Sequence, residues 1–167
     1  MNPRLRILFL CTGNSCRSQM AEGWAKHLKA DLIEPYSAGV IAHGMNDYVI
    51  RVMREAGVDI SAQYSKTVDE LPVKDFDFVV TLCDHAAQNC PVLPGRGVKV
   101  HMPFDDPPSL ALSASTDEEA LVPYRRVRDE IRRFIETLPQ ALTGKAAPPF
   151  ILRPPLRSEG PRRRNES

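Results

Sequence analysis

Several features that define other classes of protein are missing from this chain of 167 residues. No apolar run approaches the length of a membrane span, and the apolar start at Leu5 lacks the cleavage signature of a secretory signal. We find no internal repeat. Hydrophobic residues make up 43% and charged residues 26%, as in an ordinary globular chain. We therefore expect a cytoplasmic protein that spans no membrane and folds as one domain.

A strong charge of one sign is also missing. The net charge is +1, but residues 145–167 carry six Lys or Arg against two Glu, so residues 1–144 have a net charge of −3. A domain with this charge has no electrostatic footprint for nucleic acid, and we expect no such partner. The basic, proline-rich end has no helical or alternating period. We divide the chain into a domain at 1–143 and a disordered tail at 144–167.

The chain has few cysteines, at positions 11, 16, 83 and 90. In an intracellular chain of this size they indicate redox or metal chemistry more than a disulfide framework. Their spacings, C-x4-C and C-x6-C, depart from those usual for zinc. We therefore favour redox chemistry and predict no metal site.

Apolar segments alternate with segments of helical composition, which predicts an α/β fold with a doubly wound, mainly parallel sheet. We expect strands at 5–10, 32–37, 76–82 and 98–102, and helices at 18–29, 46–56 and 117–138. Pro35 predicts an edge strand, and Pro123 either starts or kinks the last helix. Ligands of such sheets bind beyond the carboxyl ends of the strands. Cys11, Cys83 and Asp105-Asp106 each follow a predicted strand.

The segment C-T-G-N-S-C-R-S at 11–18 lies between the first strand and the first helix, which has Glu22 in an early turn. A helix entered in this way directs backbone N–H groups at the loop, so the loop can hold an anion. Gly13 lets the chain curl, and the Arg17 guanidinium can hold two oxygens of a tetrahedral oxyanion. Cys11 at the base of this cradle would be a nucleophilic thiolate. The alternative to this catalytic role is a structural one, in which Cys11 is a small buried side chain of the core.

Cys83 and Cys90 lie seven residues apart. If Asp84 to Gln88 is helical, the two Cα atoms are about 10 Å apart, which exceeds the roughly 7 Å limit for a disulfide. A bridge would require the segment to unwind, so we predict a redox switch whose disulfide a carrier protein can reduce. Inert buried thiols are the alternative.

The loop C-T-G-N-S-C-R-S-Q-M-A-E-G-W resembles that of the low-molecular-weight protein tyrosine phosphatases, and within that fold it resembles the thioredoxin-coupled arsenate reductases. The T-L-C-(x6)-C-P segment at 81–91 and the F-D-D-P segment at 104–107 are similar to motifs of these reductases. Phosphatases of the fold usually have an aromatic residue after their Asp-Pro acid, whereas Pro108 follows here. The resemblance therefore favours a reductase with this fold.

The resemblance implies a three-cysteine relay. Cys11 attacks arsenate, Asp106 protonates the departing oxygen, and Cys83 and Cys90 carry the oxidation to a disulfide that thioredoxin reduces. Asp105 is the less favoured acid. The residues implied to bind the substrate are Thr12, Gly13, Asn14, Ser15, Cys16, Arg17 and Ser18. No bound cofactor is needed, and we expect a monomer.

Two other functions remain open. A phosphatase acting on phosphomonoesters would use the same nucleophile, arginine and acid, and an oxyanion-binding or thiol-sensing module would not turn over. Thioredoxin is favoured over glutaredoxin as donor because a complete relay needs only an external dithiol.

Some relatives hold a potassium ion near the loop with a carboxylate at about position 66. The ammonium of Lys66 could occupy that space here, which predicts no such ion.

Overall fold

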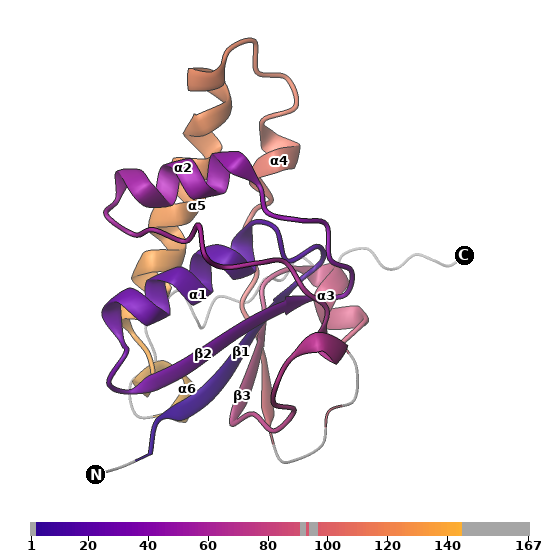
Figure 1. The fold of residues 1–167 in the computed structure, drawn as a ribbon, viewed down its shortest axis with the longest axis vertical. Helices are drawn as coiled ribbons and strands as arrows, with labels where there is room; N and C mark the ends of the chain where they lie inside the picture. Colours follow the sequence, from indigo (N-terminus) through magenta and orange to yellow (C-terminus); the bar gives the residue numbers. More distant parts are fainter. Residues whose placement is uncertain (1–2, 91–92, 94–96, 145–167) are drawn as a thin grey trace.

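The computed structural model describes residues 3–90, 93 and 97–144. Within them the chain forms a four-stranded sheet in the order β2-β1-β3-β4, in which every neighbouring pair is parallel (Figure 1). The strands are β1 (Leu5–Cys11), β2 (Ile33–Gly39), β3 (Phe78–Thr81) and β4 (Val98–His101). The predicted α/β fold and its parallel sheet are confirmed.

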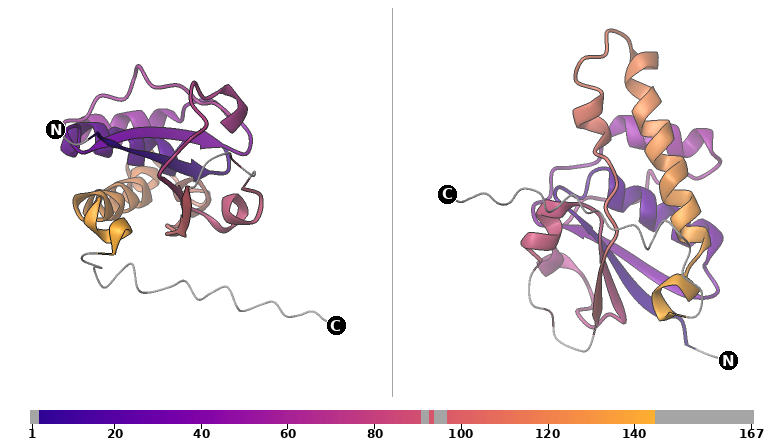
Figure 2. Two further views of the ribbon diagram at one scale, coloured as in Figure 1. Left: turned by 90° about the horizontal axis from the view of Figure 1, so that it is seen from below. Right: turned by 180° about the vertical axis from the view of Figure 1, so that it is seen from behind.

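Helices connect and cover the strands. They are α1 (Arg17–Leu28), α2 (Asp47–Glu55), the 3-10 turn η1 (Val68–Glu70), α3 (Asp84–Gln88), α4 (Pro107–Leu110), α5 (Asp117–Glu136) and α6 (Gln140–Thr143). In Figure 1, α3 lies beside the carboxyl ends of the strands, whereas α6 lies near the start of β1, an arrangement that Figure 2 also shows. No helix among the described residues is long and apolar enough to cross a membrane.

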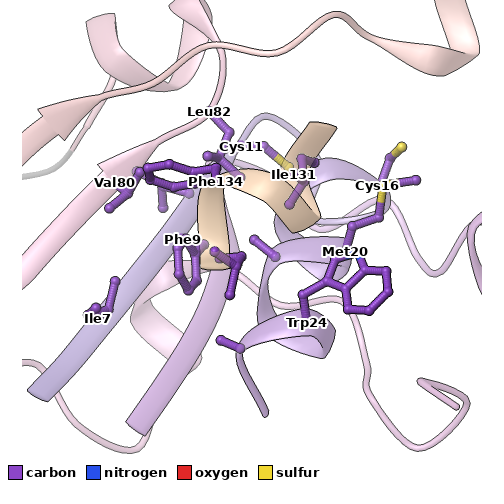
Figure 3. Packing of buried hydrophobic residues seen from close by; sticks show 14 of the residues in the cluster. Ile7, Phe9, Cys11, Cys16, Met20, Trp24, Val80, Leu82, Ile131 and Phe134 are labelled. Atoms are coloured by element: carbon purple, nitrogen blue, oxygen red, sulfur yellow. The ribbon is translucent and has the colours of Figure 1, made fainter. Parts of the chain in front are cut away.

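The core is built around β1. Its residues Ile7 to Leu10 have no exposed surface, because the strand lies between two neighbours in the sheet and is covered on both faces. Phe9, Met20, Trp24, Ile131 and Phe134 are among the fully or nearly fully buried residues of this cluster (Figure 3). The Trp24 indole N–H donates to the Arg128 carbonyl at 3.1 Å, which joins α1 to α5.

Some predicted boundaries are wrong. β2 continues through Gly39, beyond the predicted 32–37, and β3 is shorter than the predicted 76–82. The edge position of the Pro35 strand is confirmed, since an edge strand tolerates a residue without an N–H group. Pro123 lies inside α5, which begins at Asp117. Apart from Gly144, the predicted tail at 144–167 lies outside the described residues.

Candidate active site at the end of the first strand

The loop after β1 turns its carbonyl groups outward. The carbonyl oxygens of Cys11, Thr12 and Gly13 accept hydrogen bonds of 2.9 to 3.3 Å from backbone N–H groups in the segment 40–43. Because a trans peptide group points its C=O and N–H in opposite directions, the next three N–H groups face the inside of the loop. An inward row of N–H groups is a site for an anion.

Two glycines allow the close packing of this loop. A Cβ atom on Gly13 would lie 2.4 Å from Nδ1 of His43, and one on Gly39 would lie 2.4 Å from the Ile41 carbonyl oxygen and 2.8 Å from the Asn14 nitrogen. A larger residue at Gly13 would push the His43 side chain away, and one at Gly39 would displace the backbone that holds the loop carbonyls outward.

Arg17, the first residue of α1, closes the other side of the loop. Its guanidinium donates to the Phe104 carbonyl at 3.0 Å and lies 3.2 Å from the Asp106 carboxylate. Its Nε–H is buried and has no partner among the described residues, so it remains available to an oxyanion. Asp105 instead pairs with Arg126 on α5 at 2.9 Å. Of the two acids, Asp106 therefore faces the loop.

The Cys11 sulfur ends a chain of buried polar groups. Two serine hydroxyls accept hydrogen bonds from the Asn14 side-chain amide, Ser18 at 2.8 Å and Ser37 at 3.1 Å. Ser37 donates to Glu22 at 2.5 Å, and the Ser18 oxygen lies 2.8 Å from the sulfur of Cys11. Since Asn14 supplies the proton in its bond to Ser18, the Ser18 hydroxyl can direct its own proton at the Cys11 sulfur.

Asn14 itself has a left-handed backbone, with φ of 49°. Asparagine tolerates this region better than other non-glycine residues. The side-chain oxygen accepts from the Gln19 amide and the Lys66 backbone N–H, both at 2.9 Å. With its donors used as well, Asn14 is fully satisfied and fixes the shape of the loop.

Glu22 lies in the second turn of α1 and is buried. Its carboxylate pairs with Lys26 at 2.7 Å and lies 3.9 Å from the Lys66 ammonium. Burial lowers the pKa of Lys66, an effect that Glu22 partly offsets. The ammonium of Lys66 therefore lies beside the polar chain under the loop.

Cys16 is the loop residue that directly precedes α1, and its side chain is buried (Figure 3). Burial raises the pKa of its thiol well above the usual range, and the nearby Cys11 raises it further. Cys16 is thus favoured as a neutral thiol.

Cys83 comes to the mouth of the same loop. It is the N-cap of α3, its sulfur accepts from the Ala86 N–H at 3.4 Å, and the Thr12 hydroxyl lies 3.2 Å from it. The helix predicted for Asp84 to Gln88 is present with those bounds. Cys90 follows the helix and is half-buried.

Most of the residues predicted from sequence therefore meet at one place: the loop 11–18, Asp106 and Cys83. Cys90 is separated from the loop by the length of α3. Sequence reasoning missed Ser37, although the parallel register that pairs it with Phe9 places it near the end of β1. It also missed Arg126, which pairs with Asp105, and it missed Ser109, whose hydroxyl donates to Asp106 at 2.6 Å.

Among the described residues, no group of three or more His, Cys, Asp and Glu side chains could hold a metal ion. The absence of a bound ion near Lys66 stays a prediction.

Residues 6–147 match the model of the family described as low molecular weight phosphotyrosine protein phosphatase. The chain is 52% identical over 145 residues to an arsenate reductase of Halalkalibacterium halodurans, an alignment that covers 87% of this chain and 100% of the relative. It is 49% identical over 135 residues to an arsenate reductase of Bacillus subtilis, which covers 78% of this chain and 95% of the relative.

Solved structures give the same comparison. An arsenate reductase in the phosphate binding state superposes with a TM-score of 0.62 at 30% identity, covering 80% of this chain and 95% of the other. A low molecular weight protein tyrosine phosphatase from T. tengcongensis superposes with a TM-score of 0.60 at 24% identity, covering 80% and 97%. The second likeness shows the fold alone.

Proposed function

The chain belongs to the low molecular weight phosphotyrosine protein phosphatase family, and on this premise we propose that it is an arsenate reductase that works through a relay of Cys11, Cys83 and Cys90, with thioredoxin as the electron donor. Its relatives at about half identity are named arsenate reductases, which supports this activity over the other activities of the family.

One observation carries the proposal: a second thiol stands at the mouth of the oxyanion loop. Cys83 lies 3.2 Å from the hydroxyl of Thr12, the residue next to the nucleophile. Hydrolysis of a phosphate ester requires a nucleophile, an arginine and an acid, but no further thiol. Reduction of an oxyanion requires a source of two electrons, which a pair of thiols supplies when it becomes a disulfide.

In the first step the thiolate of Cys11 attacks arsenate held by the loop N–H groups and Arg17. A sulfur–arsenic bond forms, and one oxygen leaves as water after Asp106 donates a proton. The inward N–H groups and the guanidinium stabilise the negative charge that develops on the remaining oxygens.

In the second step the thiolate of Cys83 attacks the Cys11 sulfur. The sulfur–arsenic bond breaks, its electron pair stays on arsenic, and arsenite leaves while a Cys11–Cys83 disulfide forms. Cys90 then attacks Cys83, which releases Cys11 as a thiolate and leaves a Cys83–Cys90 disulfide. Because α3 separates these two residues, this disulfide requires α3 to rearrange. Thioredoxin reduces it, so no bound cofactor is needed.

Phosphatase activity is the second candidate, because Cys11, Arg17 and Asp106 alone could hydrolyse a phosphomonoester. The experiment measures NADPH consumption on adding arsenate to the protein with thioredoxin and thioredoxin reductase, in parallel with hydrolysis of a chromogenic aryl phosphate. We expect arsenate-dependent NADPH loss with weak hydrolysis. Strong hydrolysis without NADPH loss would identify a phosphatase instead.

A Cys83→Ser variant tests the relay itself. We expect it to keep any aryl phosphate hydrolysis, because the first step does not use Cys83, and to lose multiple turnover of arsenate. Gln88→Ser, an exposed change on the same helix, is the matched control and should turn over arsenate normally. Full multiple turnover of arsenate by Cys83→Ser would refute the relay.

A further inference from the structure

The Thr12 hydroxyl lies close to two side chains, Cys83 at the N-cap of α3 and His85 within α3. Its oxygen lies 3.2 Å from the Cys83 sulfur and 3.4 Å from Nδ1 of His85. A threonine hydroxyl can accept one proton and donate another at the same time. Thr12 therefore connects a thiol to an imidazole two residues further along the chain, and the reactive loop itself supplies the connection.

The other ionisable groups at this corner have different partners. The Asp84 carboxylate accepts a hydrogen bond from Nε2 of His101 at 2.8 Å. Nδ1 of His101 lies 2.8 Å from the Thr81 hydroxyl. His101 is thus held between α3 and β3, and Asp84 points to it. This leaves His85 as the imidazole that faces Thr12 and Cys83.

Cys83 and His85, the two residues that Thr12 connects, differ in their exposure to solvent. Cys83 is 7% exposed, so its thiol has little contact with water, whereas His85 is exposed. A proton leaving Cys83 has a short path to solvent through Thr12 and the imidazole. Histidine is the side chain best suited to accept a proton near neutral pH.

We propose that His85 is a positioning residue that removes the Cys83 proton through the Thr12 hydroxyl and so prepares Cys83 for its attack on Cys11. This inference rests on the proposed function, because it concerns the second step of the relay. The S–H proton of Cys83 passes to the Thr12 oxygen while the Thr12 hydroxyl proton passes to Nδ1 of His85. A thiolate and an imidazolium result, and the imidazolium later releases its proton to water.

The test is a single-turnover experiment without thioredoxin. Arsenate is mixed with the reduced protein carrying Cys90→Ser, so that the first disulfide is not passed on, the reaction is quenched with acid, and the Cys11–Cys83 disulfide is measured by mass spectrometry. We expect His85→Ala to slow disulfide formation about 10- to 100-fold, in the range of general acid–base effects. Added imidazole should restore much of the rate, because His85 is exposed and its place is open to a small base.

Three controls sharpen this result. Gln88→Ala, an exposed change on the same helix, should form the disulfide at the wild-type rate. Thr12→Val should be slow and should not respond to imidazole, because the connecting hydroxyl is gone. Hydrolysis of an aryl phosphate by His85→Ala should stay at its wild-type rate, since the Cys11 step does not use His85. A wild-type disulfide rate in His85→Ala, or a slow rate that imidazole does not change, would overturn the proposal.

A second measurement separates this inference from the proposed function. The alkylation rate of Cys83 by iodoacetamide, followed on the Cys83 peptide, requires no arsenate. We expect a slower rate in His85→Ala and its recovery with imidazole. If the wild-type protein failed to reduce arsenate, the proposed function would fall, and the alkylation rates would still decide whether His85 activates Cys83.

Discussion

At the scale of single residues, the Ser18 oxygen lies 2.8 Å from the Cys11 sulfur and can donate a hydrogen bond to it. We predict that Ser18→Ala slows aryl phosphate hydrolysis and Cys11 alkylation roughly 10- to 100-fold, because a hydrogen bond to a charged group contributes about 1.5 to 3 kcal/mol. The measurement is the rate of iodoacetamide alkylation at neutral pH, followed on the Cys11 peptide. Ser113→Ala, an exposed change, is the control. An unchanged rate in Ser18→Ala would show that the hydroxyl does not donate to the sulfur.

A second residue-scale prediction concerns the buried ammonium of Lys66. Burial lowers the pKa of Lys66 below its ordinary value of 10.5. Between the lowered and the ordinary pKa the unfolded chain binds more protons than the folded protein, so this group makes the free energy of unfolding rise with pH. We expect the wild type to gain stability relative to Lys66→Met as the pH approaches 10.5 from below.

Urea unfolding of both proteins at a series of alkaline pH values measures this difference. Lys99→Met removes an exposed lysine on β4 and controls for the loss of one positive charge. A difference between wild type and Lys66→Met that is constant or falls with pH would contradict the assignment.

At the scale of elements, α5 contains a proline where a helix normally has an N–H donor. Pro123 lies six residues after the first residue of the helix, so the carbonyl of Glu119 lacks its usual partner. We predict that Pro123→Ala raises the free energy of unfolding by roughly 1 to 3 kcal/mol, since proline costs about 3 kcal/mol in a helix interior. Urea unfolding measures it, and an equal or lower stability would mean that the surroundings have adapted to the proline.

The elements could be predicted from the sequence better than their ends. Apolar runs and helical spacing identified the strands, the three long helices and the α3 segment. The end of β2 was missed because Gly39 looks like a turn residue in isolation, yet its N–H donates to the Lys66 carbonyl at 2.9 Å. That hydrogen bond links residues far apart in the chain, and no local pattern contains it.

At the scale of the whole molecule, the parts of the site that lie within one segment could be predicted from the sequence, and the parts that depend on contacts between distant segments could not. The loop and its arginine form one short segment, so their chemistry could be predicted from residue types and spacing. The buried chain through Ser37 and Glu22 could not, because it depends on the register between β1 and β2 and on how α1 packs against them. The contact of His85 with Thr12 likewise depends on where α3 meets the loop.

Oxyanion binding should also be visible in the stability of the whole molecule. A ligand that binds only the folded state adds about 2.7 kcal/mol at 100 times its Kd, which raises the Tm of a chain of this size by roughly 5 to 10 °C. We expect phosphate and arsenate to raise the Tm of the wild type in this way, without any electron donor. Arg17→Ala should lose most of the shift because it removes the guanidinium, whereas Arg54→Ala, an exposed change on α2, should keep it. An equal shift in Arg17→Ala would place the anion outside the loop, because binding there uses the Arg17 charge.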